Sequence, residues 1–167
     1  MITNLEQLYF DQLRDLFSAE KQLIEALPEM ATNATNDELR DAFSNHLQET
    51  RTQKDRLRQI FDRHGLNPEG EDCDAMRGLI KEAGKHITDT NPGSVRDAVL
   101  IASANRVEHY EIAAYGVAKA FAECLGYDDD VKLLHESIEE EGNADDTITR
   151  IATGGLFRSG VNEAAAR

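Results

Sequence analysis

Apolar side chains recur at intervals of three and four residues along most of the chain, and this period most constrains its fold. It is the period of an α-helix, and the alternation of β-branched residues that marks strands is absent. The pattern therefore predicts an all-α protein. We expect long helices over residues of about 4–31, 36–64, 95–125 and 127–153.

Capping patterns mark the beginnings of the first two expected helices. Thr3 with Glu6, and Thr35 with Glu38, each have the spacing of a capping box, in which two side chains satisfy the first backbone N–H groups. Gly65 follows the second helix as a residue that favours a helix end.

The connections between the expected helices indicate their topology. Short links near 32–36 and 126–129 make two antiparallel hairpins, and the segment of about 66–93 can cross the length of a bundle. That segment contains a shorter amphipathic helix, 73–87. Two hairpins joined by one crossover form a ferritin-like four-helix bundle, and an up-down-up-down bundle with an inserted helix is the alternative. We expect a single domain over residues 1–167, with a loose tail from about 155.

Polar residues interrupt the apolar rows that should form the core of this bundle. They are Glu20 on the first expected helix, His46 and Glu49 on the second, Glu108 and Glu111 on the third, and Glu141 and Asp145 on the fourth. Counted from the hairpin turns, they lie at a similar depth, about 15–25 Å along the bundle. No lysine or arginine on these rows can neutralise them. Metal ions would, and several carboxylates with one imidazole suit iron or manganese.

Each of these residues alone also has a plainer interpretation. Glu20 could be a surface acid, His46 a core histidine with satisfied hydrogen bonds, and Asp145 part of a solvated face beside further acids. Within the charged run 136–146, either Glu140 or Glu141 could face inward. Agreement in depth across four helices favours the metal site over these separate explanations.

Composition excludes other classes of partner. The chain has 32 acidic and 18 basic residues and a formal net charge of −14, which argues against binding nucleic acid or anionic lipid. The first residues show no basic segment followed by an apolar one, and no apolar run approaches about 18 residues, so we expect neither a signal peptide nor a membrane span. Cys73 and Cys124 form no disulfide or metal pattern, so we expect a reduced, cytoplasmic protein. The excess of acidic residues could be an adaptation to a salt-rich cytosol, or it could create an electrostatic field that attracts metal ions.

Four stretches resemble the YciF/YciE-type ferritin-like stress protein family. They are "LRDLFSAEKQL", "HLQET", "RVEHYEIAAYG" and "LLHESIEEEGNADD", and together they carry all seven candidate ligands. The resemblance implies a four-helix bundle with an extra crossover helix, usually a homodimer, distantly related to rubrerythrin-like di-iron proteins. In di-iron bundles two helices supply Glu-x-x-His. Here the second helix has His46-x-x-Glu49 and the fourth has no histidine at the site, so the centre would be rich in carboxylates.

Three functions remain open at this point. The first is a di-metal oxidoreductase that acts on dioxygen or peroxide with two iron ions, or manganese in their place. Tyr115, one turn from Glu111, is then a packing residue, a hydrogen-bond donor to a ligand, or a redox-active group. The second is non-catalytic iron binding or buffering during stress, and the third is a structural bundle without metal. We also expect a homodimer, because Leu100, Val117 and Phe121 lie off the bundle rows.

Overall fold

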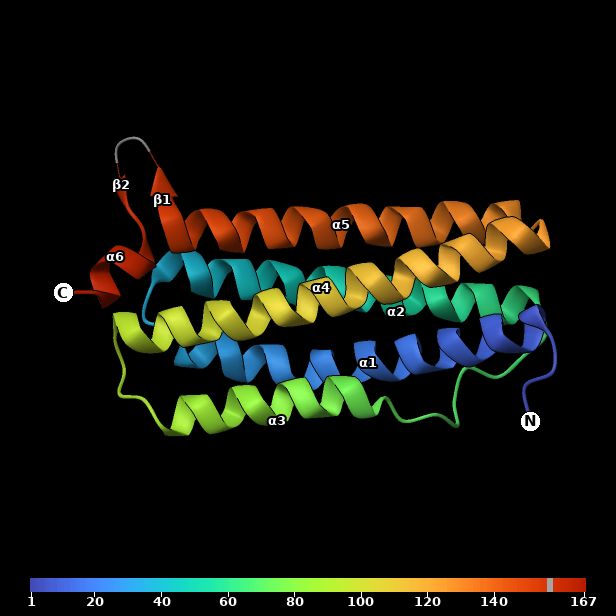
Figure 1. Cartoon of the computed structure of the whole chain (residues 1–167), viewed down its shortest axis with the longest axis horizontal. Coiled ribbons are helices and arrows are strands. Elements are labelled where there is room, and N and C mark those ends of the chain that lie inside the picture. The colour runs from blue at the N-terminus through green and yellow to red at the C-terminus, as the bar shows by residue number, and fades with distance from the viewer. Residues whose placement is uncertain (156–157) are drawn as a thin grey trace.

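The computed structural model describes residues 1–155 and 158–167, and nearly all of them are helical (Figure 1). The elements are α1 (Leu5–Asn33), α2 (Asp37–Arg63), α3 (Asp74–Thr88), α4 (Ser94–Leu125), α5 (Asp128–Thr153), a two-stranded hairpin of β1 (Gly154–Gly155) and β2 (Arg158–Ser159), and α6 (Val161–Ala165). The all-α prediction is confirmed, and each predicted helix end lies within two residues of the observed one.

The long helices form two antiparallel hairpins that pack side by side. Figure 1 shows α1 and α2 running in opposite directions, as do α4 and α5, while the crossover returns along the bundle so that α4 runs parallel to α2. Helix α1 contacts α2 and α4, and α5 contacts α4 and α2. The two-hairpin arrangement is therefore confirmed. The up-down-up-down alternative is wrong, because it requires α4 to run antiparallel to α2.

Helix α3 lies in the crossover, as predicted, and packs against α1 and α4. Its buried residues include Met76 and Ala83. The preceding residue, Cys73, is a buried free thiol whose Sγ lies 3.2 Å from Asp15 Oδ2 and 3.0 Å from the Tyr110 hydroxyl. The Tyr110 hydroxyl also donates to Asp15 at 2.5 Å. These contacts join the start of α3 to α1 and α4.

The caps of the first two helices differ by one residue from the prediction. Asn4 and Asn36 are the N-caps, and their side-chain oxygens accept backbone N–H groups at 2.8 and 3.0 Å. Asparagine caps a helix at least as well as threonine, so adjacent Asn and Thr residues compete for the position. Thr3 precedes the cap, and the Thr35 hydroxyl instead accepts the Gly93 N–H at 3.0 Å.

The prediction of a loose C-terminal tail is wrong for the described residues 158–167. Helix α6 packs against α4 and α5, and Val161 is buried in the core cluster at this end of the bundle. A side-chain carbon at Gly160 would collide with the carbonyl oxygen of Ala152, so the chain passes close to the end of α5. Residues 156 and 157, which belong to the predicted tail, lie outside the described residues.

Leu100 does not support the expected homodimer, because it is buried inside the protomer. Phe121 packs partly buried against the core, whereas Val117 is 44% exposed. The homodimer therefore stays a prediction, which sedimentation at micromolar concentration can test. Among the described helices, none has the length and apolar character needed to span a membrane.

Asp97 of α4 ties the two hairpins together at the α1–α2 turn. It is 3% exposed, and its two oxygens accept the backbone N–H groups of Thr35 at 2.7 Å and Asn36 at 3.0 Å. Bonds from N–H groups to a carboxylate are stronger than neutral ones, and losing the acceptor leaves both donors unsatisfied.

We expect Asp97→Ala to lower the free energy of unfolding by about 2–4 kcal/mol, because both N–H groups lose their acceptor. Urea unfolding with chelator present measures this value. The control is Asp55→Ala, an exposed acid of α2 whose loss should change stability by less than about 0.5 kcal/mol. Equal effects of the two substitutions would contradict the role given to Asp97.

Candidate metal centre

Four carboxylates and one imidazole lie inside the bundle at its middle. Glu20 comes from α1, His46 from α2, Glu108 and Glu111 from α4, and Glu141 from α5. The four glutamates are at most 1% exposed and His46 is 4% exposed. They occupy positions that continue the apolar rows of their helices, so the helical period that buries the core buries them as well.

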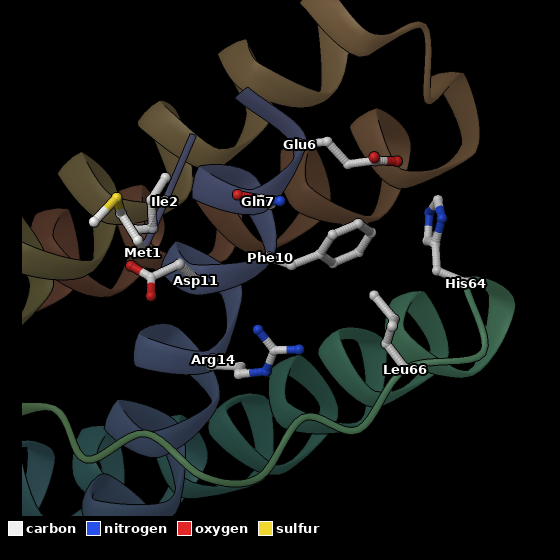
Figure 2. Close-up of a pocket in the computed structure, with 9 residues that line it drawn as sticks. All are labelled: Met1, Ile2, Glu6, Gln7, Phe10, Asp11, Arg14, His64 and Leu66. Atoms are coloured by element: carbon white, nitrogen blue, oxygen red, sulfur yellow. The ribbon is translucent and has the colours of Figure 1, made fainter. Parts of the chain in front are cut away.

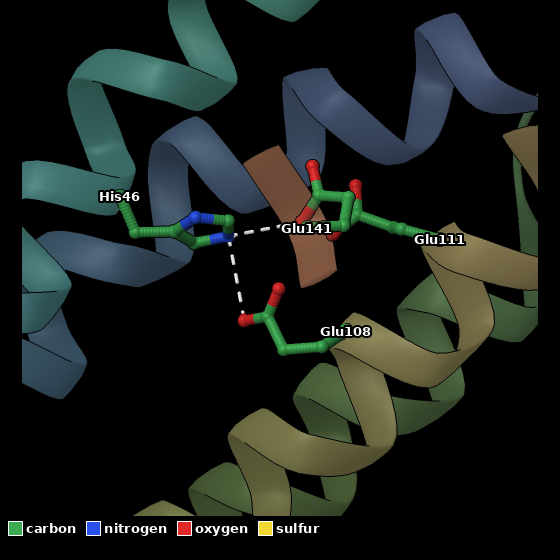
Figure 3. A group of neighbouring side chains, drawn as sticks. All are labelled: His46, Glu108, Glu111 and Glu141. Carbon is green, nitrogen blue, oxygen red and sulfur yellow. Dashed lines mark ion pairs between the residues drawn. The ribbon is translucent and has the colours of Figure 1, made fainter. Parts of the chain in front are cut away.

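His46, Glu108, Glu111 and Glu141 form a compact group, here called the four-residue cluster (Figure 3). One ligand atom from each of these residues lies within 4.8 Å of the others. His46 Nε2 lies 3.4 Å from Glu108 Oε1 and 3.8 Å from Glu141 Oε2. Three helices thus bring one nitrogen and three carboxylates to a single point, which a metal ion could occupy.

Glu20 lies beside the four-residue cluster, and Tyr115 holds it from the other side. The Tyr115 hydroxyl donates a hydrogen bond to Glu20 Oε1, while Glu20 Oε2 has no hydrogen-bond partner among the described residues. Tyr115 is itself fully buried. It is therefore both a packing residue and a donor that orients a carboxylate at the site, while a redox-active role stays a prediction.

Glu49 and Asp145, also predicted as ligands, lie at the edge of the site. The Glu49 side chain is 43% exposed, and its Oε2 lies 3.5 Å from His46 Nδ1. The Asp145 carboxylate turns toward α4, where it accepts from Asn105 Nδ2 at 2.6 Å and lies 3.5 Å from His109 Nε2. The structure thus places Glu49 next to the imidazole and gives Asp145 other partners.

Most of the buried polar atoms of the site lack hydrogen-bond partners among the described residues. The atoms without a partner among the described residues are both ring nitrogens of His46, Glu20 Oε2, Glu108 Oε2, and both oxygens of Glu111 and of Glu141. Buried polar atoms in folded proteins are nearly always paired, and an unpaired buried charge is very unfavourable. Cations bound among these atoms would satisfy them. The donor set, mostly carboxylate with one imidazole, fits iron or manganese.

Burial and mutual repulsion change the pKa values of the site. Burial first, and then the charge of Glu141, raises the pKa of Glu20, Glu108 and Glu111 well above the usual carboxyl value. Burial also raises the pKa of Glu141, although the nearby imidazole of His46 opposes this. Burial lowers the pKa of His46, but Glu49 and Glu141 outweigh it and the net direction is upward. The metal-free site therefore favours bound protons.

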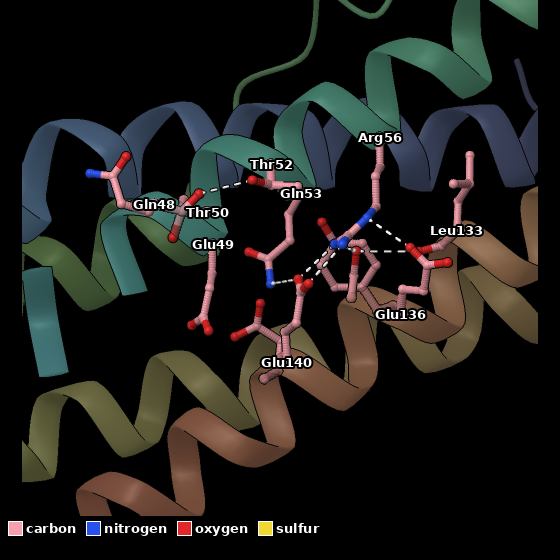
Figure 4. Close-up of polar contacts among 12 residues, drawn as sticks. Gln48, Glu49, Thr50, Thr52, Gln53, Arg56, Leu133, Glu136 and Glu140 are labelled. Carbon is pink, nitrogen blue, oxygen red and sulfur yellow. Dashed lines mark hydrogen bonds and ion pairs between the residues drawn. The ribbon is translucent and has the colours of Figure 1, made fainter. Parts of the chain in front are cut away.

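A polar network beside the cluster was missed from sequence (Figure 4). Arg56 of α2 donates to both oxygens of Glu140 at 2.6 and 2.7 Å, and Gln53 Nε2 donates to the same carboxylate at 3.1 Å. Arg56 lies off the row used for the prediction, and only its long side chain brings its charge to the site. The network also resolves the uncertainty within the run 136–146, since Glu140 faces Arg56 and Glu141 faces inward.

A separate pocket lies at the end of the bundle where α1 begins (Figure 2). It has a volume of about 510 Å³ and includes Phe10 and Leu66 in its lining. Its basic groups already have partners: Arg14 Nε donates to the Asn67 carbonyl at 3.1 Å, and His64 Nε2 lies 2.7 Å from a carboxylate of α5. The unpaired groups that indicate chemistry are those at the middle of the bundle.

We expect Glu111→Gln to stabilise the metal-free protein at neutral pH. A raised pKa in the folded state gives stability below the unfolded carboxyl value near 4.5, and this stability is lost as pH rises through the folded pKa. Metal-free wild type should therefore lose stability from about pH 5 to 7, and the amide removes one contribution to that loss. The expected rise in melting temperature at pH 7 is about 2–8 °C.

The same substitution should weaken metal binding, so the melting temperature of wild type should fall with chelator and that of Glu111→Gln should respond less. The exposed Glu139→Gln on α5 is the matched control and should behave as wild type. The metal site would be contradicted if chelation changed neither melting temperature and Glu111→Gln melted lower than wild type in both states.

The comparisons with known proteins agree with this fold. Residues 4–166 match the family described as domain of unknown function DUF892. The chain is 42% identical over 161 residues to protein YciF of Escherichia coli strain K12. The aligned region covers 96% of this chain and 97% of that protein.

Solved structures extend the likeness to three dimensions. The crystal structure of the E. coli stress protein YciF has a TM-score of 0.86 at 44% identity, with 89% of this chain and 94% of that chain covered. YcfI from Rhodopseudomonas palustris has a TM-score of 0.88 at 42% identity, with 90% and 96% covered. A protein from Xanthomonas campestris, 15% identical with a TM-score of 0.70 over 88% and 89% of the two chains, shares the fold alone. With a match over nearly its whole length, the chain belongs to the DUF892 family and is a YciF-like helical protein.

Proposed function

We propose that the protein binds iron ions, or manganese in their place, in the buried centre at the middle of the bundle. The observation that carries this proposal is the set of buried carboxylate oxygens and imidazole nitrogens without hydrogen-bond partners. A purely structural bundle would pair such groups with each other or with cations. The nearest guanidinium, that of Arg56, is already bound by Glu140 and Glu136.

We propose two ions. His46, Glu108, Glu111 and Glu141 would hold the first, as their shared geometry supports. Glu20 would hold the second together with Glu111 and Glu141. The three lie close enough that the charge of Glu141 raises the pKa of Glu20 and the charge of Glu20 raises the pKa of Glu111. Tyr115 would keep Glu20 Oε2 turned toward the ions by occupying the other oxygen.

Asp145 is left out of this ligand set, because Asn105 holds its carboxylate.

When bound, iron would supply Lewis acidity and a change of oxidation state at dioxygen or peroxide. The residues of this chain would hold the ions in place, keep them largely away from bulk water, and release on metal binding the protons that burial favours at the metal-free Glu20 and Glu108 carboxylates. An oxidoreductase of the stress response is the use that we propose first, since the similar E. coli YciF is described as a stress protein. Iron buffering is the second, because the same ligands would also store ions.

Addition of ferrous ion to metal-free protein in air separates these uses. We expect oxidation of about two ferrous ions per chain, because the site offers ligands for two. Continued turnover with peroxide supports the oxidoreductase, and uptake that stops at saturation supports buffering. Absence of binding would leave the structural bundle and contradict the proposal.

Glu141→Gln should lower the affinity for ferrous ion at least about tenfold, because it removes a charged ligand from the compact group. Anaerobic titration followed by metal analysis measures this affinity. Glu139→Gln, two residues away on the same helix and 66% exposed at its side chain, should leave it unchanged. Equal affinities in all three proteins would mean that the ion binds elsewhere.

A further inference from the structure

A pocket of about 160 Å³ opens between α2 and α5 and reaches the buried centre. Its lining residues are Ala42, Asn45, His46 and Glu49 of α2 and Asn143, Ala144, Thr147 and Ile148 of α5. Asn45 and Asn143 are exposed, whereas His46 is buried. The pocket therefore runs from solvent, past amide and carboxylate oxygens, to the imidazole of the four-residue cluster.

His46 forms the boundary between this pocket and the centre. Its side chain is 5% exposed, and neither ring nitrogen has a hydrogen-bond partner among the described residues. Nδ1 lies 3.5 Å from Glu49 at the rim, and Nε2 lies 3.4 Å from buried Glu108. The ring thus has one nitrogen toward the pocket side and the other toward the cluster, as Figure 3 shows for the Nε2 ion pairs with Glu108 and Glu141.

Side-chain contacts fill three other places beside the centre. Further along the α2–α5 seam, Gln53 and Arg56 both bind Glu140, and Figure 4 shows this network one turn beyond Glu49. Between α1 and α4, the Tyr115 hydroxyl binds Glu20. Where α3 covers α1 and α4, the remaining cavity has a volume of only about 30 Å³. The pocket at Glu49, by contrast, includes His46 of the four-residue cluster in its lining.

Glu49 is suited to a transient contact with a cation. Its side chain is 43% exposed, so it can bind a hydrated ion at the surface, and it lies next to a ring nitrogen of the centre. A divalent ion loses bound water at a high free-energy cost unless oxygen ligands replace it stepwise. The net charge of −14 also raises the local concentration of cations around the protein.

We infer that this pocket is the path by which a divalent cation reaches the buried centre, with Glu49 as the first ligand on the path rather than a resident ligand. The inference rests on the proposed metal binding. It assigns a separate role to Glu49, which the sequence had grouped with the resident ligands. Because a residue on a path serves both directions, its loss should slow binding and release by the same factor.

Stopped-flow absorption with Co²⁺ and metal-free protein tests this path. We expect Glu49→Gln to lower the rate constants of Co²⁺ binding and release together by about tenfold, with the Kd and stoichiometry unchanged. Ala144→Leu, which fills part of the pocket without removing a charge, should give the same paired decrease. Asp62→Asn removes one exposed carboxylate from α2 away from the pocket and should match wild type.

Each other result has a distinct meaning. A higher Kd in Glu49→Gln with an unchanged binding rate would make Glu49 a resident ligand and overturn the path. Unchanged rates in both Glu49→Gln and Ala144→Leu would place the route elsewhere and also overturn it, while the proposed function would stand. Failure of wild type to bind Co²⁺ in the buried centre would overturn the proposed metal binding and the path with it.

Discussion

Repulsion among buried carboxylates is the constraint on which the rest of the structure depends. Glu20, Glu108, Glu111 and Glu141 occupy core positions that would otherwise hold apolar side chains. They separate two apolar clusters. One includes Leu27 of α1 and Phe43 of α2, and the other includes residues from the first half of α1 and the end of α2. Apolar burial in both clusters holds the helices in place, and this keeps the acids close together despite their repulsion.

Stability and metal binding are therefore linked in this bundle. Without a metal, the acids are accommodated by taking up protons, which is why burial raises their pKa values. A cation would compensate the same charges at neutral pH and so would favour the folded state. The seam between α2 and α5 is packed differently on the two sides of Glu49. The Arg56–Glu140 ion pair bridges the two helices on one side, whereas a pocket lies between them on the other.

Local sequence predicted most of the fold because each long helix carries its own period and its own end signals. The caps shifted by one residue, since Asn4 and Asn36 stand beside equally suitable threonines. The tail was predicted to be loose because the ends of a chain are usually poorly ordered unless packing holds them. Its order comes from Val161, which is buried against helices distant in sequence.

The sequence by itself determined that acids from four helices meet at one depth, because helical rise and turn position fix the level of each residue. It could not determine which of them face one another, since a rotation of a helix by one residue, about 100°, exchanges Glu140 for Glu141. Only the tertiary structure placed Glu49 at a pocket and turned Asp145 toward Asn105. Those outcomes depend on the packing of neighbouring helices. They also depend on long side chains such as that of Arg56, which contacts residues that its position in the helical row does not predict.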